Sequence, residues 1–230
     1  MDSHFESVQC LKVRERRITR MAKLYFLGGE DIIKRDSREI NEMAFRDAGR
    51  MPAVLVFLWA RASFDKAYKR MKSLCDYFRN LGASTVDFAD YSDTFEEINR
   101  KVEGSDLVYL PGGLTSVLIE RLRRKGVDLL LRGYDKVIVG RSAGALALCK
   151  KGVITDRNKA AVKMVTGLGL VDFGIKVHYK PSKDIELKRL SKEEKIYAIP
   201  ERSALVYDNG RLSFIGNVYV FQNGEKTRAD

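Results

Sequence analysis

Histidine and cysteine are scarce in this chain. Its 230 residues include only two histidines, His4 and His178, and three cysteines, Cys10, Cys75 and Cys149. The cysteines are odd in number and lack the paired spacing of a metal site. We therefore expect reduced thiols, with no disulfide framework and no metal or other cofactor. Such cysteine usage is typical of a cytoplasmic protein, which is the location we expect.

Long apolar runs are also missing. Lys and Arg interrupt every stretch that approaches the roughly 20 apolar residues of a membrane span. No apolar stretch of about 7–15 residues follows the basic residues near the N-terminus, so we expect no secretory signal. Because 45% of the residues are hydrophobic, the chain can still bury a full core.

Acidic residues are outnumbered, 31 to 42, which gives a net charge of +11. The signs are nevertheless mixed along the chain, as at residues 192–195, where two lysines flank two glutamates. No stripe of basic residues interleaved with aromatics is present, and no DNA- or RNA-binding motif. We therefore expect no specific nucleic-acid binding and a general attraction to small anionic substrates.

Apolar runs alternate with helix-type patterns from residue 21 onward. Strands are predicted at residues 24–27, 53–59, 85–89, 106–110 and 137–139, and helices at 38–48, 64–81, 94–102, 115–124 and 143–150. Such alternation predicts an α/β fold, a mostly parallel flavodoxin-like sheet with helices on both faces. Short strands after residue 195, with an Asp-Asn-Gly turn at 208–210, predict an antiparallel C-terminal extension of that sheet.

The sequence pattern divides the chain into two segments, residues 1–20 and residues 21–230. Residues 1–20 are polar and basic without a clear period, and they predict an extension with little fixed structure or a short surface helix. Residues 21–230 contain no repeat or linker, so we expect one catalytic domain there. Glycine-rich ends of its strands are predicted to meet at one edge of the sheet, where ligands bind in folds of this class.

The segment around Ser142 has the most informative pattern. Residues 137–139 are apolar and lead into Gly-Arg-Ser-Ala-Gly at 140–144, followed by helix-forming residues. A serine between two glycines at a strand-to-helix turn is the sequence form of a nucleophile elbow. The turn presents a hydroxyl next to free N–H groups at a helix start. We interpret Ser142 as a candidate nucleophile.

A serine nucleophile needs a base within hydrogen-bond reach. His4 lies in the doubtful extension, whereas His178 closes the strand-like run at residues 175–177. An isolated histidine is more often structural, but the scarcity of histidine combined with the elbow favours His178 as the base. A carboxylate must then orient its ring. The sequence offers four candidates: Asp156, Asp172, Asp184 and Glu201.

Two of these carboxylates follow strand-like segments. Glu201 follows residues 196–199 and Pro200, and Asp156 follows residues 152–155. An oxyanion site also needs two backbone donors. Elbow geometry supplies the amide of Ala143. The amide of Gly113 is the natural second donor, because residues 111–113 read Pro-Gly-Gly at the end of the neighbouring strand. No Lys follows at the spacing of a phosphate-binding loop.

Four blocks of the chain together resemble a known family. Residues 107–115, 140–145, 178–179 and 199–201, with a closing pattern at 216–224, are similar in order and spacing to the dipeptidase E and cyanophycinase family of serine peptidases. The resemblance implies a fold like that of class I glutamine amidotransferases and a Ser-His-acid triad. It implies Ser142 as nucleophile, His178 as base and Glu201 as acid, with Asp156 as the alternative acid.

The chain departs from the family pattern at two positions. Leu114 stands where a polar residue usually follows the two glycines, and Arg141 stands where an apolar residue or Trp usually precedes the nucleophile. Dipeptidase E members prefer an N-terminal aspartate, and cyanophycinases cut β-linked aspartyl-arginine chains. Arg141, Lys176 and Lys180 are candidates to hold a substrate carboxylate, as alternatives to simple surface charges. Gly112 is a further candidate for substrate contact.

The resemblance leads to one main expectation about function. We expect a serine hydrolase that acts on short peptides with an N-terminal aspartyl or other acidic residue through an acyl-enzyme on Ser142. One alternative is an esterase, amidase or acyltransferase with the same triad and a non-peptide substrate. The other is a non-catalytic binding protein with an anionic partner. We expect a small peptide as the partner and no membrane association, and the chain allows a homodimer.

Overall fold

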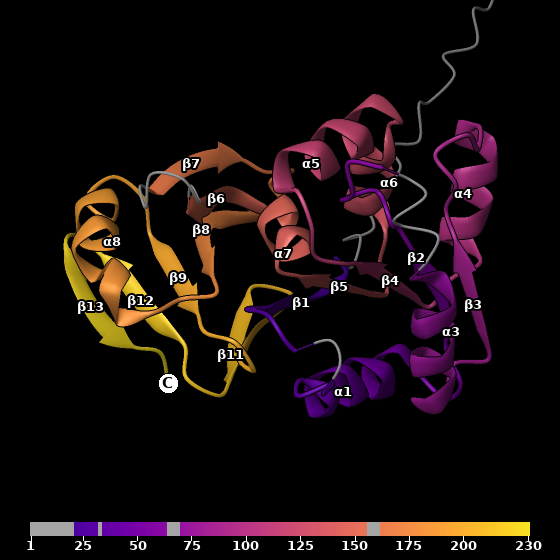
Figure 1. The fold of residues 1–230 in the computed structure, drawn as a ribbon, viewed down its shortest axis with the longest axis horizontal. Helices are drawn as coiled ribbons and strands as arrows, with labels where there is room; N and C mark the ends of the chain where they lie inside the picture. Colours follow the sequence, from indigo (N-terminus) through magenta and orange to yellow (C-terminus); the bar gives the residue numbers. More distant parts are fainter. Residues whose placement is uncertain (1–20, 32–33, 64–69, 156–161) are drawn as a thin grey trace, which may run out of the picture.

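Seven strands form the main sheet of the computed structural model, which describes residues 21–31, 34–63, 70–155 and 162–230. Its strand order is β11-β10-β1-β5-β4-β2-β3 (Figure 1). The five parallel strands are β1 (Lys23–Leu27), β2 (Ala53–Val56), β3 (Thr85–Phe88), β4 (Leu107–Leu110) and β5 (Val137–Arg141). The hairpin β10 (Ala204–Asp208) and β11 (Arg211–Ile215) joins β1 in antiparallel orientation.

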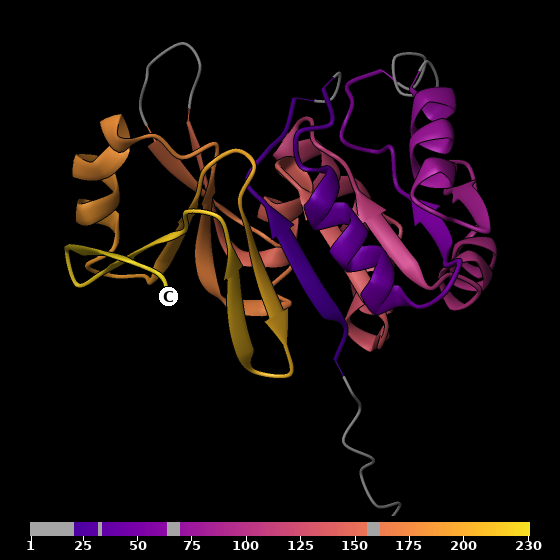
Figure 2. The same cartoon turned by 90° about the horizontal axis from the view of Figure 1, so that it is seen from below.

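Helices cover both faces of this sheet. One face carries α1 (Arg38–Ala48) and α3 (Met71–Asn80), and Figure 2 looks onto α1, drawn in indigo. Their buried residues, such as Phe45 and Phe78, pack with Tyr25 and Tyr109 of the strands. The other face carries α4 (Phe95–Glu103), α5 (Thr115–Arg124), α6 (Val127–Gly133) and α7 (Ala143–Leu148). The apolar stripes of the helices pack on a sheet whose central strands β4 and β5 are buried on both faces, as expected for a parallel sheet.

A second sheet of six strands lies beside the first (Figure 1). Its order is β13-β12-β9-β8-β6-β7. The strands are β6 (Cys149–Thr155), β7 (Val162–Thr166), β8 (Val171–Val177), β9 (Ile196–Ile199), β12 (Tyr219–Gln222) and β13 (Glu225–Arg228). A 3₁₀ turn η1 (Pro181–Lys183) and helix α8 (Asp184–Leu190) connect β8 to β9. Phe173 of β8 packs its ring against Phe26 of β1, so one core joins the two sheets.

The predicted fold class is confirmed, and several element boundaries differ. β10 and β11 extend the main sheet as predicted, but β9 and β12 belong to the second sheet, which was not predicted. Residues 152–155 of β6 are strand-like in the sequence, but the helix predicted at 143–150 covers its first two residues, Cys149 and Lys150. α7 ends at Leu148 because β6 begins at Cys149. Residues 1–20, and the first part of the helix predicted at 64–81, lie outside the described residues.

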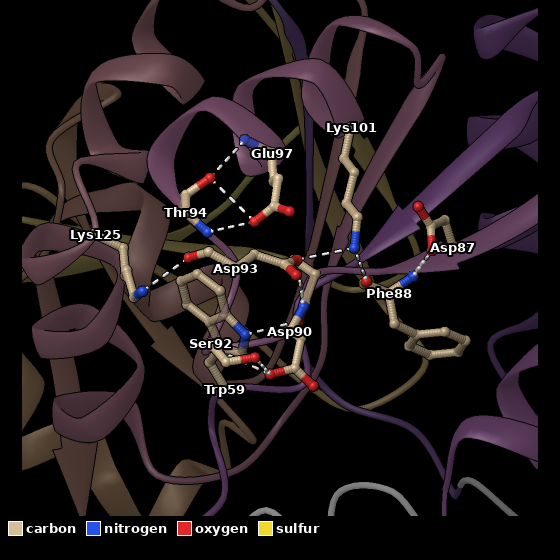
Figure 3. Close-up of polar contacts among 11 residues, drawn as sticks. Trp59, Asp87, Phe88, Asp90, Ser92, Asp93, Thr94, Glu97, Lys101 and Lys125 are labelled. Carbon is tan, nitrogen blue, oxygen red and sulfur yellow. Dashed lines mark hydrogen bonds and ion pairs between the residues drawn. The ribbon is translucent and has the colours of Figure 1, made fainter.

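A polar network fixes the loops at the far edge of the main sheet (Figure 3). Thr94 and Glu97 form a capping box at the start of α4. The Asp93 carboxylate accepts hydrogen bonds from the Asp90 amide at 2.9 Å and from Lys101 Nζ at 2.8 Å. Trp59 Nε1 donates to the Ala89 carbonyl at 2.9 Å. This last bond ties down the segment after β2, which leads to the site described next.

Candidate active site

Ser142 occupies a strained turn between β5 and α7. Its φ of 53° and ψ of −106° are unusual for a residue with a side chain. The Ser142 amide donates to the Leu27 carbonyl at the end of β1, at 3.0 Å. A Cβ on Gly144 would lie 2.0 Å from the Leu110 carbonyl oxygen, and one on Gly140 would lie 2.7 Å from the Ala145 nitrogen. The backbone therefore requires glycine on both sides of the serine, as a nucleophile elbow does.

His178 reaches Ser142 from the other sheet. It follows β8, and its Nε2 lies 2.7 Å from Ser142 Oγ. The His178 amide donates to the Gly28 carbonyl at 2.9 Å. A Cβ on Gly29, which has a φ of 146°, would lie 2.4 Å from His178 Cε1. The glycines after β1 thus let the chain pass directly against the imidazole ring.

Glu201 completes a chain of three side chains. It follows β9 and Pro200, and its Oε1 lies 3.2 Å from His178 Nδ1. The next residue, Arg202, donates its amide to the Gly29 carbonyl at 3.0 Å. Successive carbonyls at residues 27, 28 and 29 therefore hold the segments that carry Ser142, His178 and Glu201.

The other candidate acids lie elsewhere or are not described. Asp172 is largely exposed and pairs with Lys150 at 2.7 Å. Asp184 accepts hydrogen bonds from Tyr179 and Lys226. Asp156 lies outside the described residues, so the structure offers no comparison with it.

The environment of His178 keeps the imidazole neutral near pH 7. Burial lowers its pKa below the usual value of 6.5, whereas the hydrogen bond and charge of Glu201 raise it. The positive charges of Lys176 and Arg141 lower it further, and the net shift is downward. A neutral imidazole beside a hydroxyl can accept its proton, which is the condition for general base catalysis.

Two backbone amides flank the serine. Ala143 is the first residue of α7, so its N–H has no partner within the helix. Gly113 follows β4 and lies against Ala60, whose carbonyl accepts the neighbouring amide of Leu114 at 2.7 Å. Within the described part of the chain, the amides of Gly113 and Ala143 donate no hydrogen bond to a loop or helix-cap carbonyl. Both donors predicted from the sequence are thus available for an oxyanion.

The basic residues singled out in the sequence have different surroundings. Arg141 is buried, and its Nη1 lies 3.6 Å from Glu30 Oε1. Lys176 is buried too, but its ammonium donates to the Val177 carbonyl at 3.0 Å, and burial lowers its pKa to about 8. Lys180 is exposed. Of the three, only Arg141 lines a cavity that also contains Gly112.

Glu30 is the site residue that sequence analysis missed. Its side chain is fully buried, and it contacts both Arg141 and Arg35. Burial raises the pKa of its carboxyl. The available signal was its position: a carboxylate directly after the two glycines that end β1.

Across residues 21–31, 34–63, 70–155 and 162–230, no group of three or more His, Cys, Asp or Glu side chains is placed to hold a metal ion. No helix in these ranges is long and apolar enough to cross a membrane.

The sequence of this chain is similar to those of known peptidases. The sequence model of peptidase family S51 matches residues 48–215. An uncharacterized peptidase of Listeria monocytogenes is 30% identical over 139 residues, which cover 55% of this chain and 68% of the relative. An uncharacterized peptidase of Listeria innocua is 28% identical over 158 residues, which cover 60% of this chain and 72% of the relative.

Two solved structures share the fold. A peptidase from an acI-B1 actinobacterium superposes with a TM-score of 0.72 at 17% identity, over 92% of this chain and 95% of the other. A peptidase E protein of Listeria monocytogenes gives a TM-score of 0.61 at 24% identity, over 84% of this chain and 98% of the other. At these identities the likeness is one of fold.

Proposed function

This chain belongs to peptidase family S51 and is a serine peptidase, and on that premise we propose that Ser142, His178 and Glu201 are its catalytic triad. The observation that carries the proposal is the unbroken series of contacts, 2.7 Å from Ser142 Oγ to His178 Nε2 and 3.2 Å from His178 Nδ1 to Glu201 Oε1. A nucleophile, a base and an orienting acid in that geometry define a triad whatever the fold.

The reaction begins with proton transfer from Ser142 to His178. Ser142 Oγ attacks the carbonyl carbon of the scissile amide while Nε2 accepts the hydroxyl proton. The carbonyl oxygen becomes an oxyanion, which accepts hydrogen bonds from the amides of Gly113 and Ala143. When the tetrahedral intermediate collapses, His178 gives its proton to the departing amine, and the acyl group stays on Ser142.

Water then releases the acyl group. His178, neutral again, takes a proton from water as the hydroxide adds to the ester, and returns it to Ser142 Oγ when the acid product leaves. Glu201 accepts the Nδ1 hydrogen throughout, which fixes the imidazole tautomer and stabilises the imidazolium. Its carboxylate is half-exposed, so solvent screens part of this stabilisation.

For the substrate we propose short peptides with an acidic residue beside the scissile bond, N-terminal aspartyl peptides being the first class to test. The chain carries a net charge of +11, and Arg141 directly precedes the nucleophile, with its guanidinium in a cavity beside the scissile bond that can hold a carboxylate from the residue on either side of that bond. Arginine is well suited to bind a carboxylate through two parallel hydrogen bonds.

Turnover of a dipeptide panel tests this proposal. Asp-Leu, Asn-Leu, Leu-Leu and the ester Asp-methyl ester should be compared with wild-type protein and with Ser142→Ala. We expect hydrolysis of Asp-Leu well above Asn-Leu, and no hydrolysis by Ser142→Ala. Full activity of Ser142→Ala would overturn the triad. Cleavage of the ester with no cleavage of any peptide would favour an esterase.

A further inference from the structure

Four arginines line one cavity beside the elbow. Arg35 precedes α1, Arg61 follows β2, Arg70 precedes α3, and Arg141 ends β5. The cavity has a volume of about 310 Å³, room for roughly ten water molecules at about 30 Å³ each. That is more space than a single carboxylate needs, and it is enough for a whole amino-acid residue.

The cavity adjoins the nucleophile through Gly112. A Cβ built on Gly112 would lie 3.5 Å from Arg141 Nη2 and 3.6 Å from Ser142 Oγ. The guanidinium and the nucleophile therefore flank the same backbone position. A ligand group in the cavity is next to the bond that Ser142 attacks.

Among the described residues, arginines outnumber the carboxylates that pair with them at the cavity. Arg35 and Arg141 share one carboxylate, with Nη1 atoms 3.7 Å and 3.6 Å from Glu30 Oε1. Among the described residues, neither Arg61 nor Arg70 makes an ion pair with a carboxylate. Arginine keeps its charge in proteins, so within the described part of the chain the four guanidinium groups have one paired carboxylate, Glu30, which contacts two of them. Burial and the neighbouring arginines lower the pKa of Arg70.

Arg141 is aimed into the cavity with unused hydrogen-bonding capacity. Only 8% of the residue is exposed, and its buried Nε has no acceptor among the described residues. The two carboxylate oxygens of Glu30 likewise accept no hydrogen bond from the described residues. The distances from Glu30 Oε1 to Arg35 and Arg141, 3.7 Å and 3.6 Å, allow electrostatic attraction but are too long for hydrogen bonds. A buried guanidinium with an unpaired N–H is costly unless a ligand supplies the acceptor.

Apolar side chains also line the cavity, and they should strengthen an ion pair between an arginine and a ligand. Leu58, Ala60 and Leu74 line the cavity beside the arginines, and apolar walls lower the local dielectric constant. The wall is also held in place. Arg121 Nη1 donates to the carbonyls of Trp59 and Arg61, at 2.9 Å and 2.6 Å. The Arg61 backbone is therefore fixed before a ligand arrives.

From this charge and space we propose that the arginine pocket, defined by Arg35, Arg61, Arg70 and Arg141, binds a substrate residue that carries two free carboxylates. The residue with that property in an ordinary peptide is a C-terminal aspartate or glutamate, whose α-carboxylate and side-chain carboxylate lie a few bonds apart. The inference rests on the proposed function, since it assigns the pocket to the leaving residue of the reaction at Ser142.

An N-terminal residue fits the pocket less well. It brings an ammonium group, which the guanidiniums repel, and the Glu30 carboxylate, which does not line the cavity, is already shared by two arginines. A C-terminal aspartate or glutamate brings only negative charge, which complements the positive charge of the arginines. Glu30 acts here as a positioning residue, because it holds Arg35 and Arg141 without facing the cavity.

Three matched peptides test the assignment in catalysis. Asp-Glu, Asp-Gln and Asp-Glu α-amide share one scissile bond and differ only in the carboxylates of the leaving residue. We expect kcat/KM to fall about tenfold for each carboxylate removed, mainly through KM. Arg61→Gln and Arg70→Gln should reduce this discrimination at least fivefold. Arg211→Gln, which removes an exposed charge on the β10–β11 hairpin, should leave it unchanged.

A binding measurement separates this inference from the proposed function. Calorimetric titration of Ser142→Ala with glutarate and with butyrate requires no catalysis. Glutarate should bind at least tenfold more tightly than butyrate, and Arg70→Gln in the same background should abolish the difference. Such binding without any peptide hydrolysis would retain the pocket and refute the peptidase mechanism. Hydrolysis with equal rates on the three peptides, or equal binding of the two acids, would overturn the pocket assignment alone.

Discussion

Ser142 Oγ lies 2.7 Å from His178 Nε2, although Ser142 ends a strand of one sheet and His178 ends a strand of the other. Backbone carbonyls at residues 27–29, directly after β1, accept hydrogen bonds from the amides of Ser142, His178 and Arg202. The end of β1 is therefore the common anchor of the candidate triad. Disturbing this anchor should impair catalysis more than it impairs folding.

Gly29→Ala tests the anchor. The new Cβ would overlap the His178 ring, and the alanine would have to keep the positive φ of Gly29. The imidazole must therefore move away from Ser142. A displacement of about 1 Å costs on the order of a hundredfold in rate, and we expect that loss in kcat/KM of peptide hydrolysis. Gly133→Ala is the matched control, because nothing lies within 4 Å of its Cβ. Equal activity of the two variants would contradict the anchor.

Removing the charge of Glu201 should preserve the fold and slow the reaction. Glu201→Gln keeps the shape of the side chain, but its amide NH₂ group can face His178 Nδ1 in place of a carboxylate oxygen. The imidazole tautomer is then no longer fixed. A buried triad acid is worth about 10⁴ in kcat; since Glu201 is half-exposed, we expect a loss nearer 10². The thermal midpoint of unfolding should change little. Wild-type kcat in this variant would point to a different acid.

The pH profile should reflect the lowered pKa of His178. The base acts when neutral, so kcat/KM rises as pH increases through this pKa, and the midpoint of the acid limb should lie below 6.5. Glu201 raises the pKa of His178, so in Glu201→Gln the limb should move to still lower pH. Rates measured from about pH 4 to 9 decide this. A midpoint above 6.5, or a shift to higher pH in the variant, would be inconsistent with this electrostatic account.

Backbone strain at Ser142 should appear in stability. Glycine adopts a φ of 53° and ψ of −106° more readily than alanine does. Ser142→Gly should therefore be about 1 kcal/mol more stable to urea than Ser142→Ala, after allowance for the greater freedom of glycine in the unfolded chain. Both variants should be inactive. If Ser142→Gly is the less stable of the two, the turn is not strained.

Glu30→Gln should destabilise the fold, and a dicarboxylate ligand should restore part of the lost stability. It removes the one carboxylate between Arg35 and Arg141, and loss of a buried ion-pair partner costs about 3 kcal/mol. Glutarate should then raise the unfolding temperature of Glu30→Gln more than that of the wild type, because it restores negative charge near both arginines. Equal shifts in the two proteins would mean that Glu30 and the ligand act independently.

Much of the fold and of the site follows from local sequence. The parallel strands and their glycine-rich ends are visible as apolar runs and turn signals, and the elbow needs only five residues. The scarcity of histidine pointed to His178, and among the described residues the carboxylate after β9, Glu201, lies beside it. The positions of these residues are local properties, set by where each strand ends.

Other features depend on packing that sequence patterns do not show. The strand-like residues at 152–155, 175–177 and 196–199 do not reveal which strands pair, so the second sheet and its packing against the first through Phe26 and Phe173 were not predicted. Glu30 was not singled out from the sequence. Its role depends on burial against arginines that are far away in sequence, and no local periodicity encodes such a contact.

The most direct test of the triad is covalent labelling of Ser142 by a fluorophosphonate, followed by mass analysis of the labelled peptide. The account predicts one adduct per chain, located on Ser142, with a labelling rate that rises through the same acid limb as kcat/KM. His178→Ala should slow the labelling at least a hundredfold, and Ser142→Ala should abolish it. Labelling at another residue, or no labelling in a preparation that hydrolyses peptides, would contradict the account.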